Sequence, residues 1–271
     1  MDDRAGQLVE EEVWHRVDGA VAWITLNRPQ AGNAITPAQR DRVVALLEQA
    51  GRDASVRAVV LGATGTRFCT GADLRGGVAS SGPPVMGDTA RLIRDGAQRL
   101  VAAVLDCEKP VVAAVNGTAA GIGAHLAFAC DLVVAAERAR FIEVFVRRGI
   151  APDGGGAYLL ARLVGPHRAK ELLFLGDDLS AADAERWGLV NRVVPDDQLD
   201  QVVSELAGRL AAGPTRALAA AKWLVNRAAD VDRRTAFDDE AWIQELVVGT
   251  ADATEGLAAF AERRPPVFGG A

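Results

Sequence analysis

The sequence has little of what marks a disulfide-rich or metal-stabilised protein. It contains only 3 cysteines, Cys69, Cys107 and Cys130, an odd number with no C-x-x-C spacing. We therefore expect no disulfide framework and predict three reduced, partly buried thiols. No H-x-x-H pair or Cys/His cluster indicates a metal site.

Long hydrophobic runs and an excess of basic charge are also missing. No stretch approaches the roughly 18 apolar residues that span a membrane. The N-terminal segment, MDDRAGQLVEEEV, is acidic and polar, unlike a signal or transit peptide. A net charge of −6 argues against a general nucleic-acid-binding surface, although it is compatible with a local site for a phosphate-bearing small molecule. We expect a cytoplasmic protein that binds neither membranes nor nucleic acid.

What the sequence does contain is an alternation of strand and helix patterns. Residues 21–26, 58–61, 110–115 and 131–135 are short apolar runs typical of buried strands. Thr36 and Pro37 are suited to begin a helix as N-cap and first helical residue. A second helical stripe is formed by Leu92, Ile93, Ala97, Leu100, Val101 and Val104. This alternation predicts an α/β fold with parallel strand pairing.

Beyond about residue 195 the pattern is almost wholly helical. We therefore expect a core over residues 1–195 and a C-terminal helical oligomerisation region over residues 196–271. Residues 75–88 are rich in glycine, serine and proline, which predicts a loop.

Two short segments put glycine-flanked backbone N–H groups directly after a predicted strand. One is RFCTGADL at 67–74, and the other is NGTAAGIGAH at 116–125. Unpaired N–H groups at a helix start favour negative charge. Two such donors that converge on one point form an oxyanion hole. Either segment alone could equally be a tight strand-to-helix turn that binds nothing.

Together, these two segments resemble the oxyanion-hole signatures of the enoyl-CoA hydratase/isomerase (crotonase) superfamily. The resemblance covers most of the chain, with further matches in LNRP at 26–29, GIAPDGG at 149–155, AADAERWGLV at 181–190 and FAERR at 260–264. It implies a spiral of repeated ββα units with C-terminal helices exchanged between subunits. It also implies a homotrimer or a dimer of trimers, acting on an acyl-CoA thioester. Coenzyme A is then part of the substrate, and no separate cofactor is implied.

The resemblance also implies roles for particular residues. The N–H groups of Ala72 and Ile122 would bind the thioester oxygen, where negative charge develops as a proton leaves or joins the neighbouring carbon. One well-placed donor of this kind is worth roughly 10²–10³ in rate. The implied substrate- and CoA-binding residues are Arg28, Ala31, Thr70, Phe145, Phe260 and Arg263, the last two reaching CoA from an adjacent subunit. The alternative for both arginines is a solvated surface position.

The sequence departs from the family at the two glutamates that hydratases use for water activation and proton transfer. The corresponding residues are His125 and Phe145. Asp153 remains, in a setting that resembles isomerases and aryl-CoA dehalogenases that keep an aspartate in this loop. In those isomerases the aspartate moves a proton between carbons, and in the dehalogenases it attacks as a nucleophile. The alternative is that Asp153 caps the next helix.

Two further side chains lie near these positions in the sequence. His125 could exchange protons near neutral pH, or it could be a buried, hydrogen-bonded core residue. Glu143, two residues before Phe145, would share a face with it on a strand. The 75–88 loop is expected to cover the acyl pocket.

The leading hypothesis is isomerisation of an unsaturated acyl-CoA, with Asp153 as the proton-transfer base and His125 as an assistant. A single base suffices when a proton leaves one carbon and returns to another. One alternative is an enoyl-CoA hydratase or acyl-CoA hydrolase in which Asp153 and His125 share the work. Another is a non-catalytic acyl-CoA binder.

Overall fold

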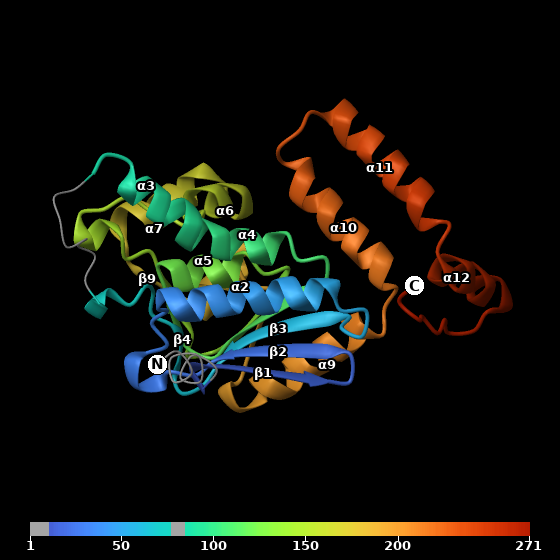
Figure 1. The fold of residues 1–271 in the computed structure, drawn as a ribbon, viewed down its shortest axis with the longest axis horizontal. Coiled ribbons are helices and arrows are strands. Elements are labelled where there is room, and N and C mark those ends of the chain that lie inside the picture. Colours follow the sequence, from blue (N-terminus) through green and yellow to red (C-terminus); the bar gives the residue numbers. More distant parts are fainter. Residues whose placement is uncertain (1–10, 77–84) are drawn as a thin grey trace.

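A computed structural model describes residues 11–76 and 85–271 of the chain, which form two β-sheets surrounded by helices (Figure 1). In the larger sheet the order is β1-β2-β3-β5-β7-β10, and in the smaller it is β4-β6-β8-β9. The larger sheet comprises β1 (Val13–Asp18), β2 (Val21–Leu26), β3 (Ala58–Ala63), β5 (Val111–Val115), β7 (Leu132–Ala136) and β10 (Arg192–Val194). The smaller comprises β4 (Arg67–Cys69), β6 (Thr118–Ala120), β8 (Arg140–Ile142) and β9 (Asp178–Ser180). Neighbouring strands are parallel except for the β1–β2 and β8–β9 pairs.

The chain alternates between the two sheets. A strand of the larger sheet is followed by a strand of the smaller sheet and then by helical structure, as in β3-β4, β5-β6 and β7-β8. This repeat confirms the predicted spiral of ββα units. Its consequence for function is that β4, β6 and β8 lie side by side and end at the same edge of the smaller sheet.

The helical elements follow from the same spiral. They are η1 (Pro29–Ala31), α2 (Pro37–Arg52), η2 (Leu74–Gly76), α3 (Asp88–Ile93), η3 (Arg94–Gln98), α4 (Arg99–Leu105), α5 (Ile122–Phe128), η4 (Val146–Arg148), α6 (Gly156–Leu163), α7 (Gly165–Leu175), α8 (Ala181–Trp187), η5 (Asp196–Gln198), α9 (Leu199–Ala211), α10 (Thr215–Ala228), α11 (Arg233–Val247) and α12 (Ala251–Glu262). In the described part of the chain, no helix is long and apolar enough to cross a membrane.

Both faces of the larger sheet are covered, which explains its continuous apolar strands. On one face Val59 and Leu61 join a core that includes residues of α2, α4 and α5. On the other, the alternate residues Ala58 and Val60 pack with apolar residues of α9. Helix α9 therefore belongs to the core layers, whereas α10, α11 and α12 continue away from the sheets (Figure 1). The proposed role of residues 196–271 in oligomerisation stays a prediction.

Helix α10 is tied back to the core by one buried cation. The Lys222 ammonium donates to the carbonyl oxygen of Val104 at 2.9 Å and to Oδ2 of Asp131 at 2.8 Å. Burial raises the pKa of the Asp131 carboxyl, and the adjacent Lys222 charge opposes that shift. This contact joins α10 to the end of α4 and the start of β7.

The second predicted helix differs from its expected stripe. A π-helical segment, η3, separates α3 from α4. A π turn contains more residues than an α turn, so it rotates the residues before it relative to those after it. Leu100, Val101 and Val104 are buried as predicted, but Leu92 is 56% exposed. The prediction that Leu92 faces the core was therefore wrong.

Candidate active site

The candidate site lies where the three parallel strands β4, β6 and β8 end. Cys69 of β4 pairs with Ala119 of β6, and Ala119 pairs with Phe141 of β8. The next residues along the chain are therefore neighbours in space: 70–72 after β4, 121–125 after β6 and 143–145 after β8. Ligands of α/β proteins bind at such carboxyl ends of parallel strands.

Close backbone contacts join the first two of these segments. A Cβ placed on Gly71 would lie 3.3 Å from the carbonyl oxygen of Ala120, and one on Gly123 would lie 2.2 Å from that of Cys69. The φ angle of Gly71 is 109° and that of Gly121 is 53°, a range that residues with side chains rarely adopt. Glycine at these positions thus lets the two predicted oxyanion segments meet.

The backbone N–H groups of Ala72 and Ile122 are available for an acceptor. Ala72 is held between two hydrogen bonds, from Ile35 N–H to the Gly71 oxygen at 2.8 Å and from Asp73 N–H to the Ile35 oxygen at 2.9 Å. Ile122 is the first residue of α5, where an N–H has no partner within the helix. Neither N–H makes a hydrogen bond to another described residue. This arrangement fits two donors for one oxyanion.

The loop at residues 28–34 packs against the first segment. The Thr70 hydroxyl donates to the carbonyl oxygen of Gly32 at 3.1 Å. The Arg28 guanidinium donates to the carbonyl oxygen of Ala34 at 2.9 Å and forms an ion pair with Asp73. With 12% of its side chain exposed, Arg28 is not a solvated surface arginine, so that alternative is wrong. The structure brings the loop containing Ala31 together with Thr70, and their contact with CoA stays a prediction.

Two arginines, Arg75 and Arg28, hold Asp73 in its ionised state. Hydrogen bonds from the side chains of Arg75 and Arg28, and from the backbone of Arg75, hold the pKa of Asp73 far below its usual range. Asp73 is therefore a fixed anion that anchors the residue after Ala72.

His125 and Glu143 form a buried pair behind the strand ends. The His125 side chain is 0% exposed, and its Nε2 lies 3.0 Å from Oε2 of Glu143. The Phe145 ring stacks on the imidazole at a centroid distance of 5.3 Å and an interplanar angle of 11°. His125 is thus buried and hydrogen-bonded, as one of its two interpretations predicted.

The prediction that Glu143 and Phe145 share a face of one strand was wrong. Strand β8 ends at Ile142, and both residues lie in the turn that follows. The sequence alternation gave no sign of this early end, so it also missed the contact between Glu143 and His125.

Asp153 lies in the loop between η4 and α6 and is half-buried. The N-cap of α6 is Gly155, and no side chain caps this helix, so the capping alternative for Asp153 is wrong. Burial raises the pKa of the Asp153 carboxyl; the neighbouring His125 opposes this shift, and Glu143 adds to it. These influences place Asp153 within electrostatic reach of the buried pair.

The Asp153 loop contacts both α5 residues of the site. A Cβ on Gly154 would lie 2.5 Å from Cδ1 of Ile122 and 3.4 Å from Nδ1 of His125. A Cβ on Gly156 would lie 2.1 Å from Nε2 of His125. The glycines after Asp153 therefore let this loop approach α5 closely.

The sequence as a whole matches the family model for enoyl-CoA hydratase/isomerase over residues 16–271. The chain belongs to this family. It is 37% identical to the 1,2-epoxyphenylacetyl-CoA isomerase of Escherichia coli, over 96% of this chain and 99% of that protein. It is 38% identical to a probable enoyl-CoA hydratase of Rhodobacter capsulatus, over 94% of this chain and 97% of that protein.

The fold comparison agrees with the sequence comparison. The crystal structure of a putative enoyl-CoA hydratase from Streptomyces coelicolor A3(2) superimposes with a TM-score of 0.90 at 37% identity, covering 96% of this chain and 94% of that one. Relatives named as hydratases and as isomerases therefore resemble this enoyl-CoA hydratase/isomerase family member to a similar degree.

Two of the predicted CoA-binding residues lie far from this site within the same chain. Phe260 is 85% exposed on α12, and Arg263 follows the end of that helix. Helix α12 is at the opposite end of the molecule from β4 and α5 (Figure 1). The single chain does not bring these residues to the site, and their contribution to an adjacent subunit stays a prediction. Residues 77–84 of the loop expected over the acyl pocket lie outside the described residues.

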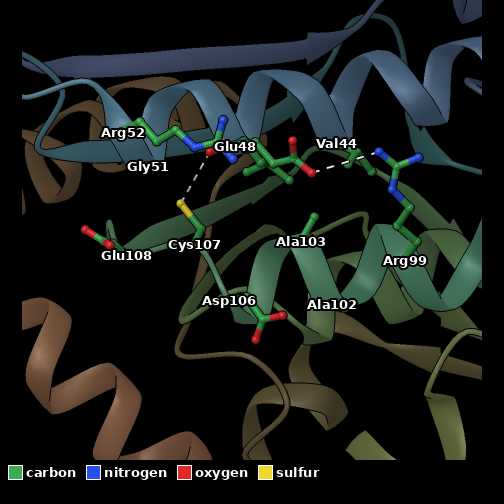
Figure 2. Close-up of a pocket in the computed structure, with 11 residues that line it drawn as sticks. Val44, Glu48, Gly51, Arg52, Arg99, Ala102, Ala103, Asp106, Cys107 and Glu108 are labelled. Carbon is green, nitrogen blue, oxygen red and sulfur yellow. Dashed lines mark hydrogen bonds and ion pairs between the residues drawn. The ribbon is translucent and has the colours of Figure 1, made fainter.

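A separate hollow of about 300 Å³ lies between α2 and α4 (Figure 2). The Cys107 thiol at its edge donates to the carbonyl oxygen of Leu47, and burial raises the pKa of this thiol. On the other side, Arg99 lies 3.9 Å from Glu48. None of the predicted site residues lines this hollow, so it is not part of the candidate active site. The described residues include no group of three or more His, Cys, Asp or Glu side chains that could hold a metal ion.

Proposed function

We propose that this protein isomerises the double bond of an unsaturated acyl-CoA, with Asp153 as the base that moves the proton. The observation that carries the proposal is the different state of two carboxylates. Glu143 is buried and hydrogen-bonded to His125, whereas Asp153 is half-buried in a loop that contacts Ile122. The similarity to a relative named 1,2-epoxyphenylacetyl-CoA isomerase, along 96% of the chain, supports an isomerase as the class of enzyme.

The proposed reaction uses the backbone donors first. The thioester oxygen accepts hydrogen bonds from the N–H groups of Ala72 and Ile122. Asp153 then removes a proton from a carbon next to the double bond or the carbonyl group. The electrons of the broken C–H bond pass through the conjugated system to the thioester oxygen. The two N–H groups stabilise the resulting dienolate.

The second step returns the same proton to a different carbon. The protonated Asp153 donates it to the far end of the dienolate, the double bond moves, and Asp153 is again a carboxylate. Because burial raises the pKa of Asp153, it is a stronger base than a solvated aspartate. No water is added and no group is lost, so substrate and product have the same mass.

The direct test is the substitution Asp153→Asn. It keeps the size of the side chain but removes the base, so isomerisation of a 3-enoyl-CoA should fall by about 10²–10⁴-fold. Binding of the thioester, measured by calorimetry, should be retained. Full isomerase activity in Asp153→Asn would overturn the assignment.

The second candidate function is hydration or thioester hydrolysis by Asp153 and His125 together. It is favoured by the proximity of the Asp153 loop to the His125 ring, which offers a second group able to exchange protons. Mass spectrometry after incubation with a 2-enoyl-CoA and the matching 3-enoyl-CoA distinguishes hydration, hydrolysis and isomerisation. A gain of one water indicates hydration, and free CoA indicates hydrolysis. An unchanged mass with a shifted double bond indicates isomerisation.

A non-catalytic acyl-CoA binder is the remaining reading. It is motivated by the absence of both hydratase glutamates, at residues 125 and 145. It predicts tight thioester binding with no turnover across chain lengths and aromatic acyl groups.

A further inference from the structure

The His125 ring has two nitrogens in different surroundings. Nε2 is 3.0 Å from Oε2 of Glu143. Nδ1 is buried and makes no hydrogen bond among the described residues. It lies on the side of the ring near Gly154, where a Cβ would be 3.4 Å away. The unpartnered nitrogen therefore faces the loop that carries Asp153.

The ring cannot easily turn to exchange these surroundings. Phe145 stacks on it at 5.3 Å with an interplanar angle of 11°. The backbone at Gly156 approaches so closely that a Cβ there would lie 2.1 Å from Nε2 and 2.4 Å from Cε1. A fixed orientation keeps Nε2 on Glu143 and Nδ1 near the Asp153 loop.

Burying Glu143 lowers the stability of the folded state, so packing alone does not explain a glutamate at this position. Its side chain is 3% exposed, and Oε1 makes no hydrogen bond among the described residues. A buried carboxylate with a single hydrogen-bond partner costs stability that an apolar side chain of similar volume would not. A role in setting the state of His125 accounts for a carboxylate at this position.

We infer that Glu143 is a positioning residue that holds His125 in the tautomer protonated at Nε2, leaving Nδ1 as a proton acceptor that faces the loop carrying Asp153. An ionised carboxylate only accepts hydrogen bonds, so the Nε2 atom that contacts it must carry the proton. In a neutral ring the other nitrogen then has a free lone pair. The same logic orients the histidine of a Ser-His-Asp triad.

This inference rests on the proposed function, because it gives Asp153 a partner that can accept the proton that Asp153 has taken from the substrate. Nδ1 accepts a proton from the Asp153 carboxylic acid and later returns it. The positive charge that forms on the ring is stabilised by the adjacent Glu143 carboxylate. No other reactant is required.

The first experiment measures the tautomer directly, without an activity assay. The full chain has 3 histidines, so ¹⁵N-histidine labelling gives a small set of imidazole signals, and His125→Gln identifies those of residue 125. At a pH where the ring is neutral, we expect Nε2 to be protonated and Nδ1 to be unprotonated. A ring protonated at Nδ1 would overturn the inference, since Glu143 would then be the donor.

The second experiment replaces Glu143 by Gln, whose amide can either donate or accept. We expect both tautomers of His125 to appear and kcat to fall by about 10²-fold, with KM for the acyl-CoA unchanged. Glu143→Asp, which keeps the carboxylate, should restore the Nε2-protonated signal and part of kcat. Glu137→Gln is the matched control, because Glu137 is exposed in the turn before β8 and should change neither.

The outcomes separate this inference from the proposed function. Full activity in Asp153→Asn with the Nε2-protonated tautomer intact would reject the base and leave the positioning of His125 standing. Loss of activity in Asp153→Asn with wild-type kcat in Glu143→Gln would reject the positioning role alone. If Glu143→Gln does not fold, the tautomer in the wild-type chain and the Glu143→Asp variant still decide.

Discussion

As the proposed base, Asp153 would be a side chain that lowers stability and serves the reaction at once. Its loop contacts Ile122 and His125, and burial raises the pKa of its carboxyl group. A raised pKa means that the folded protein binds the proton more tightly than the unfolded chain does. The folded state is therefore penalised wherever the carboxyl is ionised, and the same penalty makes the carboxylate a better base.

This linkage predicts a pH-dependent gain in stability for Asp153→Asn. Between the ordinary aspartate pKa of about 4 and its raised value in the folded protein, wild-type stability falls as pH rises. The uncharged amide avoids this loss. Thermal unfolding should show Asp153→Asn more stable than wild type at pH 7, with the difference disappearing as pH falls to about 4.

Asp53→Asn is the control of opposite sign. Hydrogen bonds from the side chain and the backbone of Ser55 lower the pKa of Asp53, so its charge stabilises the folded state above the ordinary pKa. That variant should be less stable than wild type at neutral pH and match it in acid. The interpretation of Asp153 fails if both variants respond to pH in the same direction.

For individual residues, the sequence predicted which ones occupy the site, but it did not predict the side chains that hydrogen-bond to them. Ala72, Ile122, His125 and Asp153 come together as the motifs implied. The partner of His125 was missed because the strand pattern around Phe141 gave no sign that β8 ends at Ile142. The partner of Arg28 was missed because Asp73 is 45 residues away in the sequence.

Elements with strong local signals were predicted well. The side chain of Thr36 accepts a hydrogen bond from the N–H of Gln39, the Gln39 side chain accepts one from the N–H of Thr36, and α2 begins at Pro37. These interactions lie within four residues, so the sequence alone specifies them. Within the π turn before α4, a Cβ on Gly96 would lie 2.7 Å from Nη1 of Arg40 on α2, a long-range approach that local periodicity does not record.

The attachment of α10 gives a prediction at the level of an element. Lys222→Ala removes the ammonium that pairs with Asp131 and leaves a largely buried carboxylate without its counter-charge. We expect the free energy of unfolding to fall by about 2–4 kcal/mol, slightly below the cost of breaking a fully buried pair. Urea denaturation followed by circular dichroism measures this change.

The matched control on the same helix is Arg216→Ala. Arg216 lies 3.8 Å from Glu108, and the two side chains are 62% and 63% exposed. An exposed pair of this kind contributes less than about 1 kcal/mol. Equal, small losses in the two variants would show that the Lys222–Asp131 pair contributes no more than an exposed ion pair.

At the scale of the whole molecule, the main feature is that α12 lies far from the ends of β4, β6 and β8, where the candidate site is (Figure 1). The residues predicted to bind CoA are divided between the 28–34 loop and the far end of the chain, so the site would be completed by a second copy. This division was inferred from the resemblance, and neither composition nor periodicity could have indicated it, because both describe a single chain.

A test of this division uses two defective variants in one assembly. Arg263→Gln should raise KM for an acyl-CoA about tenfold with little change in kcat, through loss of one charged contact. KM for the shorter pantetheine thioester, which lacks the nucleotide, should not change. Mixing Arg263→Gln chains with Asp153→Asn chains and reassembling them should restore sites that have both residues.

Activity in the mixture equal to the sum of its two parts would show that each chain builds its own site. A dilute monomer with unchanged affinity for CoA esters would lead to the same conclusion.

The two proposed oxyanion donors are main-chain atoms, and this has a consequence for inherited or engineered variation. No substitution at Ala72 or Ile122, short of proline, deletes an N–H group. A single change could instead displace these donors at Gly71 or Gly121, whose φ angles of 109° and 53° disfavour any side chain. A survey that ranks residues by chemical reactivity would overlook both. The position of both donors is therefore sensitive to mutation at residues that have no side chain at all.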